Sequence, residues 1–170
     1  MNKDAILSPC GTYRYLLQRS WNPALEAVCF VMLNPSTADA EQDDPTIRKC
    51  IGFAQRLGFG QLEVVNLYAY RATNPDDMLD SAAAGIRIEG PENERVVADS
   101  VKVCHEVICA WGTHRAAQFA GPAMLAYLRR LGAKPKALRL TDKGFPGHPL
   151  YIPYAAKPVP YGHDAAGERK

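Results

Sequence analysis

The chain has 170 residues, of which 47% are hydrophobic and 22% are charged, and its formal net charge is +2. These values are typical of a globular protein, and the length fits one domain over residues 1–170. No apolar run approaches the length of a membrane span, which excludes a transmembrane protein.

The small positive charge permits nucleic-acid binding but does not imply it, because a dedicated binder usually concentrates its basic residues on one face. The chain starts with Met1-Asn2-Lys3-Asp4, which lacks the apolar core of a signal peptide. Its five cysteines form no Cys-x-x-Cys pair, which argues against a zinc site or a redox pair. We therefore expect a soluble protein of a reducing compartment, the cytoplasm, with no membrane partner.

The first predicted element is a strand over residues 13–18, which we expect at an edge of the sheet. An apolar run over 27–33 predicts a buried strand. A helix should begin at Asp44-Pro45, because an acidic N-cap followed by proline is typical of a first helical turn. Glycines beyond residue 57 should end this helix.

The remaining elements continue the alternation. In chain order they are a strand over 62–67, a short helix opening at Asn74-Pro75, a helix over 91–104, a strand over 106–111, a helix over 116–131 and a strand over 137–140. From residue 144 the chain is rich in Gly, Pro, Tyr and His and should form ordered loop.

Apolar strands separated by helices indicate a parallel sheet covered on both faces. We therefore predict an α/β fold: a three-layer α/β/α sandwich with a central, mainly parallel four-stranded sheet, plus the N-terminal edge strand.

Polar and aromatic residues follow each confident strand, and topology should bring these segments to one edge of the sheet, where open α/β sheets bind ligands. The candidate residues there are Asn34, Pro35, Ser36 and Thr37 after the first buried strand; Asn66, Tyr68, Tyr70 and Arg71 at the second; Trp111, Gly112 and His114 at the third; and His148, Pro149 and Tyr151 after the fourth.

The Asn34 amide can orient water or read a base edge, and Pro35 would hold the backbone rigid behind it. Ser36 and Thr37 have hydroxyls and amides that can bind phosphate. The alternative is a plain turn in which Ser36 only caps a neighbouring element.

An acidic cluster follows, and Asp43 is its best candidate for a catalytic carboxylate or a magnesium ligand. The alternative is a solvated loop in which Asp44 caps the next helix. We expect no resident cofactor. If the protein binds a divalent metal ion, we expect the ion at Asp43.

Asn66 lies near the end of a buried strand, where its amide needs a partner, either a ligand or a neighbouring loop. Tyr68, Tyr70 and Arg71 can stack on and hold a base or sugar, or can simply pack over the sheet edge. His114 and His148 can act as general acids or electrostatic stabilisers, or can be merely exposed. The chain has neither a Walker-type loop nor a GxGxxG motif, which argues against a nucleoside triphosphatase or a dinucleotide enzyme.

Several motifs in order resemble a known family. The runs MLNPSTADAEQDDPTIRKC, VVNLYAYRATNP, GPENE, ICAWGTH and GHPLY look like the bacterial domain-of-unknown-function family 1643 over roughly residues 12–161. This resemblance implies no activity.

A second resemblance is to the uracil-DNA glycosylase superfamily, which implies a four-stranded parallel sheet between helices. The segment Met32–Ser36 is similar to a strand end of the mismatch-specific branch, in which an Asn positions the attacking water. Ala110–Gly112 is similar to a later Leu-Trp-Gly-like strand end, and His148-Pro149 to a loop that contacts the flipped nucleotide. Asn66 falls where that fold places a base-reading Asn.

These observations predict a nucleobase- or nucleotide-directed hydrolase that cleaves a glycosidic bond, with Asn34, His148 and Asp43 as its catalytic residues and a nucleobase, nucleotide or nucleic acid as its partner. Two alternatives stay open: a module that binds a nucleotide or single-stranded nucleic acid without catalysis, and a metal-assisted phosphoesterase.

Overall fold

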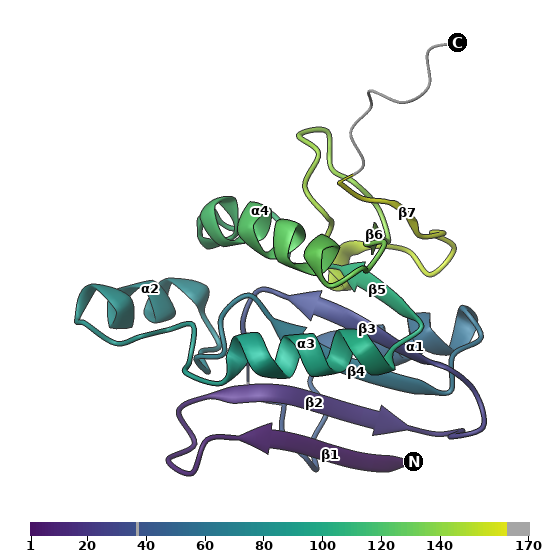
Figure 1. Cartoon of the computed structure of the whole chain (residues 1–170), viewed down its shortest axis with the longest axis horizontal. Helices are drawn as coiled ribbons and strands as arrows, with labels where there is room; N and C mark the ends of the chain where they lie inside the picture. Colours follow the sequence, from purple (N-terminus) through teal and green to yellow (C-terminus); the bar gives the residue numbers. More distant parts are fainter. Residues whose placement is uncertain (37, 163–170) are drawn as a thin grey trace.

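The computed structural model describes residues 1–36 and 38–162. Its core is one mixed sheet with the strand order β1-β2-β4-β3-β5-β6-β7 (Figure 1). The strands are β1 (Asn2–Leu7), β2 (Arg14–Ser20), β3 (Ala27–Met32), β4 (Gln61–Asn66), β5 (Glu106–Cys109), β6 (Lys136–Ala137) and β7 (Val159–Pro160). The neighbours β4, β3, β5 and β6 run parallel, whereas β1, β2 and β7 extend the sheet by antiparallel pairing.

In the described residues four α-helices connect the strands: α1 (Pro45–Arg56), α2 (Pro75–Ala83), α3 (Asn93–Val103) and α4 (Arg115–Arg130). Asp44 caps α1 through a hydrogen bond from the Ile47 amide, and Asn74 caps α2 in the same way through Asp76. Both caps are followed by proline, whose fixed φ suits the first helical position. A short 3-10 helix, η1 (Pro149–Tyr151), follows His148.

Alternation along the parallel strands sends side chains to two separate cores. In β3, Val28, Phe30 and Met32 pack with α1, while Cys29 and Val31 pack with residues of α3 and α4. The period of two that a strand imposes therefore buries both faces of this central strand, each beneath helices.

The structure confirms an α/β fold, and β3, β4 and β5 run parallel as predicted, but within residues 1–36 and 38–162 the sheet is mixed and has seven strands rather than four. The strand predicted over 137–140 is only the two-residue β6, which shares Ala137 with that prediction. The predicted edge strand is β2, and it is not at the edge, because β1 pairs outside it. The sequence hides β1 because its residues are exposed or half-buried, so no buried face marks it. The loop predicted from residue 144 contains η1 and β7.

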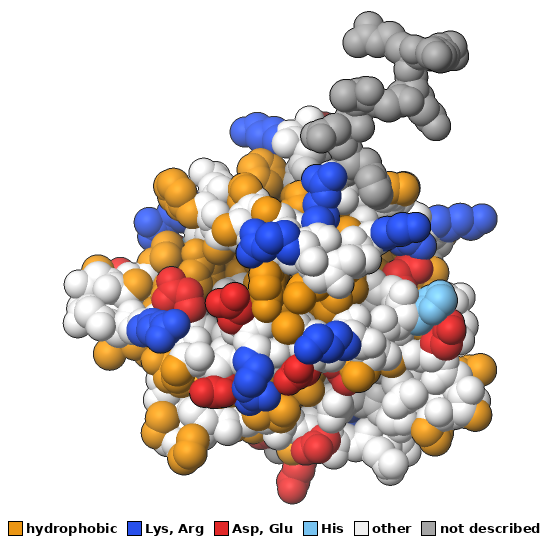
Figure 2. All heavy atoms as spheres, viewed as in Figure 1, with side chains coloured by type: hydrophobic (Ala, Val, Ile, Leu, Met, Phe, Trp, Pro, Cys, Tyr) orange, Lys and Arg blue, Asp and Glu red, His pale blue; other side chains and the backbone are white. Residues whose placement is uncertain are grey.

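The face that carries α3 has interspersed charges (Figure 2). Arg95 on α3 pairs with Glu92 and Asp99, and Lys102 lies 3.7 Å from the same Asp99. This face therefore lacks the concentrated basic surface typical of a dedicated nucleic-acid binder.

Among residues 1–36 and 38–162, no helix combines the length and the apolar character that a membrane span needs.

Candidate functional site

A cavity of about 880 Å³ lies where the parallel strands end. In Figure 1 the arrows of β3 and β5 point toward the side of the molecule that carries α2. The cavity is lined there by residues that follow β3, β4 and β5, by the start of α1 and by the segment before and within η1. This is the edge at which open α/β sheets place their ligands.

The cavity brings together eight of the residues predicted from the sequence: Asn34, Ser36, Asn66, Trp111, Gly112, His114, His148 and Tyr151. Six others do not line it, namely Pro35, Asp43, Tyr68, Tyr70, Arg71 and Pro149. Thr37 lies outside the described residues.

The Asn34 side chain is fixed by the backbone around it. Its Nδ2 donates to the carbonyl oxygens of Ala72 at 2.8 Å and Pro35 at 3.1 Å. The Pro35 carbonyl also accepts from the Ala72 amide at 2.9 Å, so the two loops after β3 and β4 are tied together. Because both protons of Nδ2 are engaged, Oδ1 is the acceptor that the amide can offer to a water or a ligand.

Asn66, the last residue of β4, has the most unusual environment. The residue is 1% exposed, and neither Oδ1 nor Nδ2 has a hydrogen-bond partner among residues 1–36 and 38–162. A buried amide without partners is costly, and in a native protein it calls for an explanation such as a ligand or water. The Asn66 carbonyl, in contrast, accepts from Nδ2 of Asn93 on α3 at 2.9 Å.

His148 is held in one tautomer. Its Nδ1 accepts from the Leu150 amide at 3.3 Å, so the proton of the neutral ring lies on Nε2. Burial lowers the pKa of His148, and the negative charge of Asp44 opposes this shift only in part. At neutral pH the ring is therefore neutral and can donate one hydrogen bond from Nε2.

His114 lines the same cavity, but the protein already uses both of its nitrogens. Nδ1 accepts from the Ala116 amide and caps α4, while Nε2 lies 3.3 Å from Oδ1 of Asp76. Arg115 also binds that oxygen, at 2.7 Å, and this hydrogen bond is the main reason that the pKa of Asp76 is lowered. The geometry favours a structural role for His114.

The three residues after β4 that were expected to stack on a base turn away from the cavity. Tyr68 is buried and donates from its hydroxyl to the Ala116 carbonyl at 2.9 Å. Tyr70 packs edge-on against Tyr13, and Arg71 donates to the Gly11 carbonyl at 3.4 Å. Tyr151, which is 80% exposed beside His148, is the aromatic side chain at the cavity with a free face.

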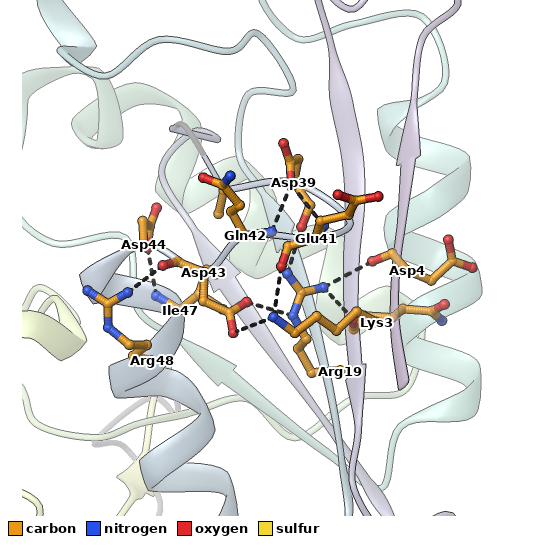
Figure 3. A network of polar contacts seen from close by, with 12 residues as sticks. Lys3, Asp4, Arg19, Asp39, Glu41, Gln42, Asp43, Asp44, Ile47 and Arg48 are labelled. Atoms are coloured by element: carbon orange, nitrogen blue, oxygen red, sulfur yellow. Dashed lines mark hydrogen bonds and ion pairs between the residues drawn. The ribbon is translucent and has the colours of Figure 1, made fainter. Parts of the chain in front are cut away.

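Asp43 belongs to a polar network beside the sheet (Figure 3). Its Oδ1 accepts from Nε of Arg19 at 2.7 Å, and its Oδ2 lies 3.3 Å from Nζ of Lys3. Both oxygens of the Asp43 carboxylate are thus paired with cationic side chains. In the part of the chain that the structure describes, no group of three His, Cys, Asp or Glu residues is arranged to hold a metal ion.

Sequence reasoning missed four charged residues of the cavity, namely Arg14, Asp44, Arg139 and Asp142. Asp44 was predicted as a helix cap, which it is, but it also lines the cavity. Arg14 was read as part of an edge strand. The signal that could have found it is a charged residue between two aromatic residues, Tyr13 and Tyr15, at the start of the predicted strand. Hydroxyls that the sequence did not single out, from Thr46, Thr73, Thr113 and Thr141, complete the polar lining.

The absence of a side chain at Gly112 allows His148 to pack closely against its backbone. The φ of Gly112 is +74°, and a Cβ added there would lie 3.3 Å from Cβ of His148. In Gly112→Ala we expect the left-handed backbone to cost about 1–2 kcal/mol and the crowding of His148 to cost about 1 kcal/mol more. Urea denaturation would measure both contributions.

Gly132→Ala is the matched control, because Gly132 has a φ of +85° and nothing within 4 Å of the added Cβ. Equal losses of stability in the two variants would contradict a contact with His148.

Comparison with known proteins gives one match. Residues 14–150 match the family model described as "Protein of unknown function (DUF1643)". No curated protein and no solved structure matches the chain.

Proposed function

The chain belongs to the DUF1643 family, and we propose that it is a glycosylase-like hydrolase that takes a nucleobase or nucleotide into the cavity and cleaves its N-glycosidic bond. The observation that carries the proposal is the buried amide of Asn66, which lines the cavity without partners. An amide presents a donor and an acceptor side by side, and this pair is complementary to the polar edge of a base.

The other fixed groups suit the bond cleavage. Oδ1 of Asn34 would accept a hydrogen bond from a water and orient it toward the sugar carbon. The water oxygen bonds to that carbon, the carbon–nitrogen bond breaks, and its electron pair leaves with the base. Nε2–H of His148 would stabilise the negative charge on the departing base, which finally takes up a proton released by the water.

The finer fold assignment belongs to the same proposal. Asn34 after β3, Asn66 at the end of β4 and His148 before η1 follow the order of functional segments in the uracil-DNA glycosylase superfamily. Met32 and Ser36 stand where the mismatch-specific branch has glycines, so this chain would take a base other than uracil. With Tyr68 and Tyr70 outside the cavity, stacking on the base would fall to Tyr151.

The test is release of free base from a panel of nucleosides, nucleoside monophosphates and oligonucleotides with single modified bases, followed by chromatography. Asn66→Asp keeps the size of the side chain but replaces its donor by an acceptor. We expect it to lower kcat/KM about 100-fold or more, because a hydrogen-bonding site rejects a mismatched partner strongly.

Asn2→Asp makes the same chemical change on the exposed strand β1 and should leave the rate unchanged. Circular dichroism would confirm that each variant is folded. A folded wild-type protein that releases no base from any member of the panel would contradict glycosidic cleavage. Saturable binding without product would instead identify the module that binds without catalysis.

A further inference from the structure

We propose that Arg14 forms an anion subsite in the cavity and that it holds the terminal phosphate of a nucleoside monophosphate. This inference rests on the proposed function for the base, and it adds the substrate class: a free nucleotide that ends in a phosphate monoester.

Arg14 is almost fully buried and lacks a partner of opposite charge. The residue is 2% exposed and lines the cavity. Its Nη1 donates to the carbonyl of Ala38, while Nε is buried and has no hydrogen-bond partner in the described part of the chain. Within residues 1–36 and 38–162, no carboxylate oxygen lies within 4.0 Å of its guanidinium. A buried charge without a partner is expensive, and a bound anion would offset that cost.

A second buried arginine on the same strand, Arg19, provides a comparison, because its guanidinium pairs with a carboxylate of the protein. Arg19 is 1% exposed, but its Nε binds Asp43 at 2.7 Å and its Nη2 donates to the Asp39 carbonyl at 2.6 Å. Both arginines belong to β2, yet of the two only Arg19 forms an ion pair with a residue that the structure describes. Arg14 therefore stands out as a cation left for a ligand.

A β-bulge accounts for the placement of Arg14. Ile6 pairs with Leu16 and Leu7 pairs with Arg14, so Tyr15 is the extra residue of β2. Tyr15 and Leu16 consequently pack in the same core, on the side of α3 and α4. Arg14 is turned to the opposite face, where the start of α1 and the cavity lie, as bulges near functional sites often do.

The charge of Arg14 persists in this environment. Desolvation lowers the pKa of its guanidinium to about 10, and Asp44 opposes the shift. The group is thus still protonated at neutral pH. Asp39 opposes the shift as well, but among residues 1–36 and 38–162 neither carboxylate forms an ion pair with the guanidinium.

The cavity around Arg14 favours a phosphate at the end of a small molecule. Ser36, Thr46 and Thr73 offer hydroxyls, and the lining carries the exposed Arg139 as a second cation beside the two acids Asp44 and Asp142. A terminal phosphate monoester can reach a guanidinium that is 2% exposed. A phosphodiester within a strand would have to continue on both sides of the buried group, so we favour the free nucleotide over nucleic acid.

Calorimetric titration with nucleoside 5′-monophosphates, the matched nucleosides, inorganic phosphate and a short single-stranded oligonucleotide tests the subsite. We expect a monophosphate to bind about 10- to 100-fold more tightly than its nucleoside, the range for a hydrogen-bonded charge. In Arg14→Gln this preference should vanish while the affinity for the nucleoside stays unchanged. Arg14→Lys should retain part of the preference for the monophosphate. Arg139→Gln also removes one positive charge but should reduce this preference much less than Arg14→Gln does.

The outcomes separate this inference from the proposed function. If Arg14→Gln retains the preference, or if wild type binds nucleoside and monophosphate equally, the subsite is wrong although base recognition stands. If inorganic phosphate binds in an Arg14-dependent way but no base-containing probe binds, the subsite stands and the proposed function fails. Arg14-dependent binding of the oligonucleotide without binding of the monophosphate overturns the assignment to a free nucleotide.

Discussion

Arg19→Met is expected to lower the free energy of unfolding by about 3 kcal/mol, the lower end of the range for breaking a buried ion pair. The guanidinium of Arg19 joins β2 to the loop before α1 through Asp43 and the Asp39 carbonyl, and its Nη1 donates to the Gln18 carbonyl at 2.7 Å. Its removal leaves Asp43, whose side chain is only 15% exposed, with the more distant Lys3 alone. Urea denaturation would measure the loss as a lower midpoint.

Arg14→Met is the matched control, since Arg14 is equally buried on the same strand but has no ion pair to lose. We expect a change well below that of Arg19→Met, because the substitution also removes an uncompensated buried charge. Equal losses in the two variants would refute the assignment of Asp43 to a structural network.

His148→Ala is expected to lower kcat about 100- to 1000-fold, as the loss of one preorganised donor to developing charge usually does. The reason is the loss of Nε2–H, which the bond from the Leu150 amide to Nδ1 keeps protonated and oriented. His148→Gln, which restores an N–H donor on a chain of similar reach, should recover part of the rate. Single-turnover kinetics on the best substrate of the panel would measure both variants.

His114→Ala provides the control at the same cavity. Its nitrogens are engaged by Ala116 and Asp76, so its loss should cost about 1 kcal/mol of stability as a lost helix cap. Its rate should stay within a few-fold of wild type. A rate loss as large as that of His148→Ala would contradict the roles assigned to the two histidines.

The lowered pKa of His148 also predicts a pH dependence. Below pH 6.5 the His148 side chain of the unfolded chain binds a proton, whereas the buried ring in the folded protein resists protonation. This contribution to the free energy of unfolding is therefore present above pH 6.5 and is lost as the pH falls through the lowered pKa of the folded state. The rate should fall over the same acidic range if the neutral ring is required. In His148→Ala this contribution to the pH dependence of unfolding should disappear.

The parts of the fold that could be predicted share one physical cause. The strands β3, β4 and β5 are recognisable because burial on both faces requires largely apolar runs, and their parallel order brings Asn34 and Asn66 to one edge. The two-residue β6 (Lys136–Ala137) has no such run, and the strand predicted there was too long. The exposed strand β1 lacks such a run, so the sequence concealed the true edge of the sheet.

The direction of individual side chains was harder to predict. Tyr68 follows the same strand as Asn66, yet it turns into the core to reach the Ala116 carbonyl, a partner 48 residues away. Arg14 faces the cavity because of a bulge at Tyr15, which depends on pairing with β1. Both contacts depend on residues that are distant in the sequence, so the local pattern of polar and apolar residues does not predict them.

The hydrogen bonds from Asn93 to the carbonyls of Asn66 and Leu67 have a consequence for the energetics of recognition. They fasten the end of β4 to α3, just as Ala72 fastens Asn34 and Leu150 fastens His148. The backbone that carries the Asn66 amide, and the side chains of Asn34 and His148, are thus already held in place in the absence of a ligand. The protein has paid their ordering entropy during folding, so a ligand can enter with little rearrangement and little loss of affinity to induced fit.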